Sequence, residues 1–178
     1  MKYICMLRGI NVGGKNKIKM DELKSIFIAI GLQDATTYIQ SGNIIFTSSI
    51  TDKTILKQKI QNAVQMKFNT SVPALILTGD ELHKIINESP YKNIDYQQFG
   101  SKILITFLND KPDAVKIADL LHYKDESEKC IFKNNVIYLF CPGGYGRSKL
   151  SNNFIERKLH IEATTRNWKT VNAIYKMI

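Results

Sequence analysis

Residues 36–47 read Thr36-Thr37-Tyr38-Ile39-Gln40-Ser41-Gly42-Asn43-Ile44-Ile45-Phe46-Thr47. Two runs rich in β-branched and aromatic residues lie on either side of Ser41-Gly42, a pair that is typical of a tight turn. The pattern predicts an antiparallel hairpin with one strand over 36–40 and the next over 43–47.

Segments with helical or strand-like patterns flank this hairpin on both sides. After Lys19, apolar residues recur every three or four positions until Gly31, a residue type that commonly follows a helix. A second helix is predicted over 51–68, and apolar runs predict strands over 2–8 and 72–77. The resulting order of strand, helix, strand, strand, helix, strand is that of a ferredoxin-like unit.

A similar order begins again later in the chain. Thr78-Gly79-Asp80-Glu81 has the capping-box spacing, which predicts a helix to about Glu88, and residues 90–101 have the composition of a linker. The elements expected after that linker are a strand over 102–108, a helix over 112–121, strands over 126–132 and 136–141 around an Asn134-Asn135 turn, a helix over 148–159 and a last helix from about Thr165. This order has a helix where a fourth strand would come.

We therefore predict an α+β protein of two ferredoxin-like βαββα(β) halves packed together, with mostly antiparallel sheets. The N-terminal ferredoxin-like half, with the helix that follows it, would occupy residues 1–89. The C-terminal βαββα half, with its final helix, would occupy residues 90–178.

The composition favours a packed protein and excludes several classes of function. Of the 178 residues, 44% are hydrophobic and 23% are charged, as expected of a globular core. No apolar run approaches the ~20 residues of a membrane helix, so we expect no membrane association and a cytoplasmic location. The three cysteines lie in or beside apolar runs and are expected as buried, reduced thiols, and the three histidines have no zinc-ligand spacing. Neither a metal nor another cofactor is predicted.

The net charge of +9 is unevenly distributed. Residues 1–24 contain six basic and two acidic residues, and residues 143–178 contain seven basic and two acidic ones. The stretch between them has twelve charges of each sign. Excess positive charge at the two ends favours an anionic partner such as phosphate, a nucleotide or a nucleic acid. A basic surface that only keeps the protein soluble is the other interpretation.

The first candidate site is the glycine-rich loop after the first strand. Gly9 and Gly14-Lys15 have the G-x-x-x-x-G-K spacing of a phosphate-binding loop. Asn16 stands where that motif has Ser or Thr, and the next helix is expected to begin three or four residues late. A looser anion-binding loop and a plain tight turn both fit the pattern. The candidate ligand-binding residues here are Arg8, Asn11, Gly13, Gly14, Lys15 and Asn16.

A second glycine-rich loop covers residues 142–149, also between a strand and a helix. Arg147 and Lys149 would lie near the N-terminus of that helix, where cations oppose the helix dipole. A bound anion would remove this conflict. The candidate residues of this loop are Gly143, Gly144, Arg147, Ser148 and Lys149.

Two shorter stretches complete the candidate set. Thr164 or Thr165 would cap the last helix, which places Arg166 in its first turn, again an unfavourable position for a cation. At the hairpin turn, polar side chains would offer hydrogen bonds to a ligand if the turn faces the first glycine loop. The candidate residues of these two stretches are Gln40, Ser41, Asn43, Arg166 and Asn167.

The same stretches resemble a known bacterial family. The matching motifs are Leu7-Arg8-Gly9-Ile10-Asn11-Val12-Gly13-Gly14-Lys15-Asn16, Lys19-Met20, Tyr38-Ile39-Gln40-Ser41-Gly42-Asn43, Gly146-Arg147-Ser148-Lys149-Leu150 and Thr165-Arg166-Asn167-Trp168. In this order, over nearly the whole chain, they are similar to the domain-of-unknown-function 1697 family. The resemblance implies a cytosolic bacterial protein with a two-part, ferredoxin-like α+β fold, and it implies no activity.

These observations predict an anion-binding module whose ligand is a phosphorylated small molecule, a nucleotide or a nucleic-acid backbone. The basic loops near the two ends of the chain would meet and form one site. An enzyme acting on a phosphorylated or nucleotide substrate is one alternative, motivated by the G-x-x-x-x-G-K spacing. A plain interaction module with a solubilising basic face is the other.

Overall fold

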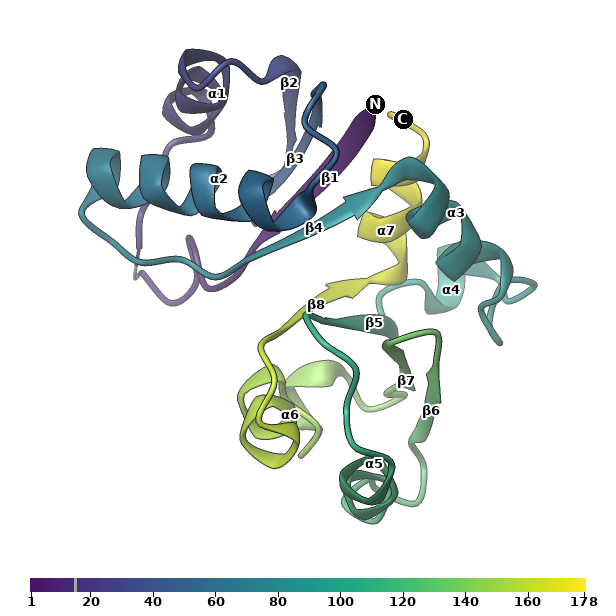
Figure 1. Ribbon diagram of the computed structural model, residues 1–178. Coiled ribbons are helices and arrows are strands. Elements are labelled where there is room, and N and C mark those ends of the chain that lie inside the picture. The colour runs from purple at the N-terminus through teal and green to yellow at the C-terminus, as the bar shows by residue number, and fades with distance from the viewer. Residues whose placement is uncertain (15) are drawn as a thin grey trace. The chain divides into compact units, whose positions relative to one another are not determined.

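The computed structural model describes residues 1–14 and 16–178 and divides them into two compact units (Figure 1). The first unit contains residues 1–82 and 174–178, and the second contains residues 83–173. The boundaries fall inside two helices, α3 (Gly79–Asn87) and α7 (Trp168–Tyr175). No helix in the described part of the chain is long and apolar enough to span a bilayer.

The first unit is a four-stranded antiparallel sheet with two helices on one face. Its elements are β1 (Lys2–Leu7), α1 (Met20–Ala29), β2 (Gln33–Tyr38), β3 (Asn43–Thr47), α2 (Lys53–Phe68) and β4 (Ala74–Thr78), and the sheet order is β2-β3-β1-β4. Alternate β1 residues, among them Tyr3 and Cys5, pack with Phe27 of α1 and Ile60 of α2 in one buried cluster. Figure 1 shows both helices on the same side of the sheet. This is the predicted ferredoxin-like arrangement.

The last residues of the chain belong to this first unit. Lys2 Nζ donates a hydrogen bond of 2.5 Å to the backbone oxygen of Ile178. A Cβ added to Gly79 would lie 3.0 Å from Ile178 Cγ2, which is a tight contact. Residues 174–178 therefore complete a unit whose sheet is built from residues 2–78.

The second unit repeats the arrangement of the first. Its elements are α4 (Tyr96–Phe99), β5 (Ile103–Leu108), α5 (Ala114–Leu121), β6 (Lys129–Lys133), β7 (Val136–Phe140), the 3-10 turn η1 (Tyr145–Arg147), α6 (Asn152–Leu159) and β8 (Ala163–Asn167), and the sheet order is β6-β7-β5-β8. Leu120 of α5 and Ile155 of α6 pack with Leu104 and Leu139 of the sheet. Two four-stranded antiparallel sheets with helices confirm the predicted α+β fold.

The strand β8 corrects the predicted end of the second half. We expected a helix from about Thr165, whereas residues 163–167 pair with β5 and the helix α7 begins at Trp168. Threonines have good strand propensity, and Thr165 Oγ1 lies 2.8 Å from Thr106 Oγ1 on β5. The cap is Asn167 rather than a threonine, since its Oδ1 accepts a hydrogen bond from Thr170 N at 2.8 Å.

The capping box at the start of α3 forms as predicted. Thr78 N donates to Glu81 Oε2 at 2.9 Å, and Glu81 N donates to Thr78 Oγ1 at 3.1 Å. Lys53 Nζ lies 2.6 Å from Glu81 Oε1. Partial burial acts to raise the pKa of Glu81, but the hydrogen bonds from Lys53 and Thr78 outweigh it, and the pKa lies below the usual 4.5.

Candidate functional site

The first glycine loop is held together by the side chain of Asn11. Asn11 Nδ2 donates to the carbonyl oxygens of Ile18 and Gln40, each at 2.9 Å, and Asn11 Oδ1 accepts from Ile18 N at 2.8 Å. These bonds close the loop on itself and tie it to the hairpin turn. The turn therefore faces the loop, but Gln40 contributes its backbone carbonyl to this contact.

Asn16 has a similar structural role. Its Nδ2 donates to the Gly9 carbonyl at 3.1 Å, and its Oδ1 accepts from Thr70 Oγ1 at 3.1 Å. Gly13 and Gly14 are exposed and have positive φ angles of 57° and 75°. The predicted site residue Lys15 lies outside the described residues.

The loop departs from the geometry of a nucleotide-binding loop. That motif requires a helix directly after its lysine, whereas α1 begins only at Met20. The preceding strand β1 lies in an antiparallel sheet, while the motif belongs to parallel ones. Arg8, at the start of the loop, is half-buried.

The hairpin turn packs against the same loop so closely that it requires glycine. Leu7 N donates to the Gly42 carbonyl at 2.8 Å. Gly42 has a φ of +74°, and a Cβ there would lie 2.7 Å from Ile10 Cδ1 and 2.9 Å from Leu7 Cβ. Asn43 is fully buried, and its Nδ2 donates to Ser41 Oγ at 2.8 Å. Predicted site residues of the turn thus stabilise the turn itself.

The second glycine loop and the last candidate stretch lie in the second unit, and their arginines do not lie in the first turns of α6 and α7. Arg147 ends the turn η1, and α6 begins only at Asn152, capped by Ser151. Arg166 lies on β8 and donates to Thr164 Oγ1 at 3.0 Å and to the Thr165 carbonyl at 2.9 Å. The prediction that these arginines begin helices, where they would oppose the helix dipole, is therefore wrong.

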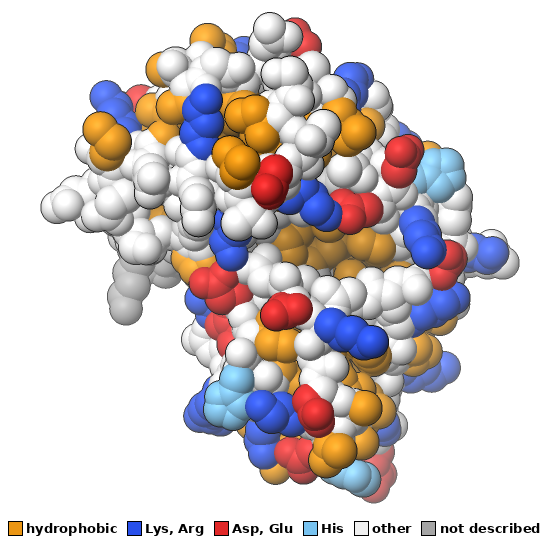
Figure 2. Space-filling view, viewed as in Figure 1, with side chains coloured by type: hydrophobic (Ala, Val, Ile, Leu, Met, Phe, Trp, Pro, Cys, Tyr) orange, Lys and Arg blue, Asp and Glu red, His pale blue; other side chains and the backbone are white. Residues whose placement is uncertain are grey.

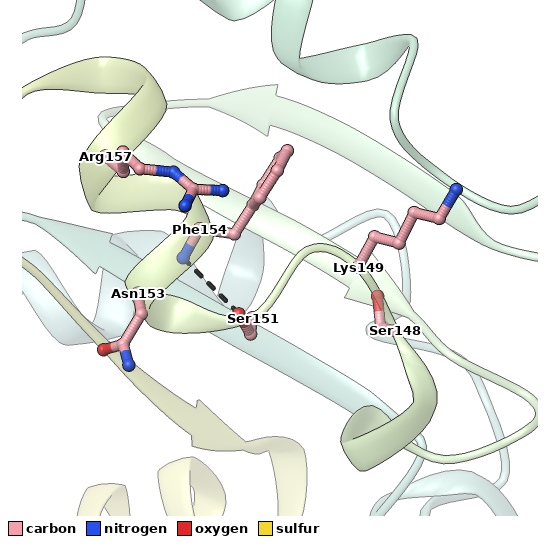
Figure 3. A pocket seen from close by; sticks show the side chains of 6 residues that line it. All are labelled: Ser148, Lys149, Ser151, Asn153, Phe154 and Arg157. Atoms are coloured by element: carbon pink, nitrogen blue, oxygen red, sulfur yellow. Dashed lines mark hydrogen bonds between the residues drawn. The ribbon is translucent and has the colours of Figure 1, made fainter.

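A pocket of about 340 Å³ lies beside the start of α6, and it includes part of the second loop (Figure 3). Its lining residues are Ser148, Lys149, Ser151, Asn153, Phe154 and Arg157. The Arg157 guanidinium carbon lies 5.3 Å from the centroid of the Phe154 ring. Figure 3 shows that ring nearly edge-on, with the Arg157 head on one side and the Lys149 side chain on the other.

The polar groups of this pocket can donate hydrogen bonds. Ser151 Oγ accepts from Phe154 N at 3.4 Å, and Ser148 Oγ accepts from Leu150 N at 3.1 Å. A hydroxyl that accepts a bond still has its own proton to donate, although the Ser148 side chain also forms a hydrogen bond with Cys141. Lys149 and Arg157 are exposed and have only donors. The pocket therefore combines two cations, two hydroxyls and an aromatic ring.

Sequence reasoning found two of the lining residues, Ser148 and Lys149. It missed Ser151, Asn153, Phe154 and Arg157, which lie on α6 or cap it. The i, i+3 spacing of Phe154 and Arg157 places them on one helix face, and this was the available signal.

The cysteines of this unit are poorly reactive: Cys141 is buried and Cys130 is half-buried. Burial, the nearby thiol of Cys141 and the carboxylate of Glu128 raise the pKa of Cys130 to about 12. Burial and Glu128 also raise the pKa of Cys141 to about 11. A nucleophilic cysteine needs a lowered pKa, so neither thiol is suited to covalent catalysis. Among the described residues, no group of three or more His, Cys, Asp and Glu side chains could hold a metal ion.

The chain belongs to a family of proteins of unknown function, DUF1697, whose model matches residues 1–138. It is also similar to a solved structure, the conserved bacterial protein SP0830 from Streptococcus pneumoniae. The two are 24% identical, the TM-score is 0.76, and the match covers 99% of this chain and 97% of the other. This likeness shows the fold alone. The search of curated proteins gave no match. The pocket residues 148–157 lie beyond the range that the family model matches.

Proposed function

We propose that this protein is an anion-binding module and that its second unit binds a phosphate-bearing ligand in the pocket beside α6. The ligand class is a phosphorylated small molecule, a nucleotide or a nucleic-acid backbone. The observation that carries the proposal is the presence of Lys149, Arg157 and the hydroxyls of Ser148 and Ser151 on the wall of one pocket.

The residue types suit a phosphate group. The planar guanidinium of Arg157 can bond two phosphate oxygens at once, and Lys149 adds a mobile point charge. The two serine hydroxyls can donate to the remaining oxygens.

The distribution of charge favours binding in one pocket over binding to a generally basic surface. On the face that Figure 2 shows, Lys and Arg side chains lie among Asp and Glu side chains and do not form one continuous patch. A surface that is basic throughout would bind polyanions wherever it is exposed, whereas this proposal restricts binding to one pocket. The two interpretations therefore predict different results for charge-matched variants.

The test compares two double variants with the same loss of charge. Lys149→Ala/Arg157→Ala removes the pocket cations, and Lys116→Ala/Lys129→Ala removes two exposed lysines of the same unit outside the pocket. The probe is a fluorescein-labelled single-stranded oligonucleotide, titrated by anisotropy over a series of salt concentrations. The pocket variant should lose at least ~10-fold in affinity, and its log K against log salt slope should fall by about 1.4 for two phosphate contacts.

The control variant should keep both its affinity and its slope. Equal losses in the two variants would show that binding depends on overall charge, which supports the plain interaction module. If the unaltered protein shows no salt-dependent binding of the oligonucleotide, a nucleic-acid backbone is excluded as the ligand. If it binds neither the oligonucleotide nor a phosphorylated small molecule, the proposal is overturned.

A further inference from the structure

Phe154 gives the pocket an aromatic ring, which the binding of a phosphate group alone would not require. The residue lies on α6, is half-buried, and lines the pocket with its neighbour Arg157. One contact of its ring is structural: Tyr123 packs against it in a T-shaped arrangement, with centroids 5.1 Å apart and planes at 65°. Two cations also lie over this ring, since the Arg157 guanidinium carbon and Lys158 Nζ are 5.3 Å and 6.0 Å from its centroid.

The surroundings of the ring match a surface on which a base can stack. Protein sites for single nucleotides and single strands combine an aromatic face with cations that follow the phosphates. The Arg157 guanidinium lies over the Phe154 ring at 5.3 Å, a cation–π distance that orients both groups. Lys149 lies on the other side of the ring in Figure 3. A base on the ring would thus share the pocket with the cations Lys149 and Arg157.

The size of the pocket limits how much of a ligand it can hold. A volume of about 340 Å³ is near the lower end for small-molecule sites, which range from about 300 to 1,000 Å³. Such a pocket has room for one base with its attached sugar phosphate. Longer ligands would extend from it into solvent.

We infer that the pocket recognises a nucleobase with its attached phosphate, and that Phe154 supplies the stacking surface. This inference rests on the proposed anion binding and adds the ligand class. A free mononucleotide and one residue of a single-stranded nucleic acid share this chemistry, so the experiment includes both.

The experiment measures binding of four probes to the full chain by isothermal titration calorimetry. The probes are AMP, ribose 5-phosphate, a ten-residue oligoadenylate and an abasic oligomer of the same length. The unaltered protein should bind AMP at least ~5-fold more tightly than ribose 5-phosphate, because stacking on an aromatic side chain contributes about 5- to 150-fold per base. The oligoadenylate should exceed the abasic oligomer by a similar factor.

Variants at Phe154 then assign the preference to the ring. Phe154→Leu keeps an apolar side chain but removes the stacking surface. Its affinity for ribose 5-phosphate should equal that of the unaltered protein, and its affinity for AMP should fall to the same value. Phe154→Tyr keeps the ring and should keep the preference. Lys149→Ala should weaken all four probes. Upfield shifts of the adenine H2 and H8 resonances in NMR spectra should occur with Phe154→Tyr and be absent with Phe154→Leu.

The outcomes separate this inference from the proposed function. If no phosphate-bearing probe binds, the proposed function fails. If ribose 5-phosphate binds as tightly as AMP, or if Phe154→Leu weakens both equally, anion binding stands and the base-stacking inference is overturned. If the oligoadenylate binds and AMP does not, the ligand is a single-stranded nucleic acid. If the oligoadenylate and AMP bind with equal affinity per site, the ligand is a mononucleotide.

Discussion

Replacing Gly42 by alanine should destabilise the first unit by about 2 to 4 kcal/mol. Gly42 has a φ of +74°, a conformation that costs an L-residue about 1 kcal/mol or more. The new methyl group would also lie 2.7 Å from Ile10 Cδ1 and 2.9 Å from Leu7 Cβ. Ile10 is buried and Leu7 Cβ is fixed to the β1 backbone, so relief of this overlap should cost about 1 to 3 kcal/mol more.

The matched control is Gly31→Ala. Gly31 has nearly the same φ, +79°, but nothing lies within 4 Å of a Cβ added there. This variant should therefore lose only the conformational cost, about 1 kcal/mol. Urea unfolding followed by far-UV circular dichroism gives both values. Equal losses for the two variants would refute the argument that the turn and the loop are in steric contact.

A second substitution locates the overlap. Ile10→Val removes the Cδ1 atom that lies closest to the added methyl group. In a double-mutant cycle, Gly42→Ala should cost less in the Ile10→Val background than in the unaltered protein. If the free-energy costs of the two substitutions are strictly additive, the Ile10 side chain is not what the added methyl group overlaps.

Three further predictions concern other contacts. Asn11→Ala removes three hydrogen bonds and should cost about 2 to 3 kcal/mol in urea unfolding while leaving the affinity of the α6 pocket unchanged; a loss below ~0.5 kcal/mol would contradict the structural role. Because the pKa of Glu81 in the folded protein lies below its unfolded value of 4.5, its contribution to stability is present above that value and is lost as the pH falls through the folded pKa. Glu81→Gln should therefore show a shallower loss of stability on acidification from about pH 5 to pH 3, and parallel curves would disprove this. With pKa values of about 12 and 11, the Cys130 and Cys141 thiols should react with Ellman's reagent at pH 8 only after urea is added.

The sequence predicts the elements whose signals are local. The capping box of Thr78 and Glu81 forms as expected, because its two hydrogen bonds join residues three apart. The Asn134-Asn135 turn likewise forms, with positive φ angles of 53° and 61° that asparagine tolerates. Such features need no information from distant parts of the chain.

The strand β8 shows where local signals mislead. Two adjacent threonines fit either a helix cap or a strand, and the choice depends on pairing with β5, about sixty residues earlier. Thr165 meets Thr106 only in the folded sheet. The sequence pattern therefore predicts Arg166 in the first turn of a helix, whereas Arg166 lies on β8, just before the cap Asn167.

The candidate site was predicted only in part for a similar reason. The glycine-rich motifs have a composition typical of binding loops, yet Asn11, Asn16 and Gly42 stabilise the loop and the turn. Phe154 and Arg157 have an ordinary helical spacing, since residues three apart commonly lie on one face of a helix. Only the folded chain brings them to the same pocket as Lys149.

The return of residues 174–178 to the first unit has a consequence for how the protein is made. The ribosome completes β1 to β4 first, and then residues 83–173 must be synthesised before the segment that ends at Ile178. At usual elongation rates this interval is roughly 5 to 20 seconds. Any sheet that the first unit forms during this interval must therefore form without residues 174–178.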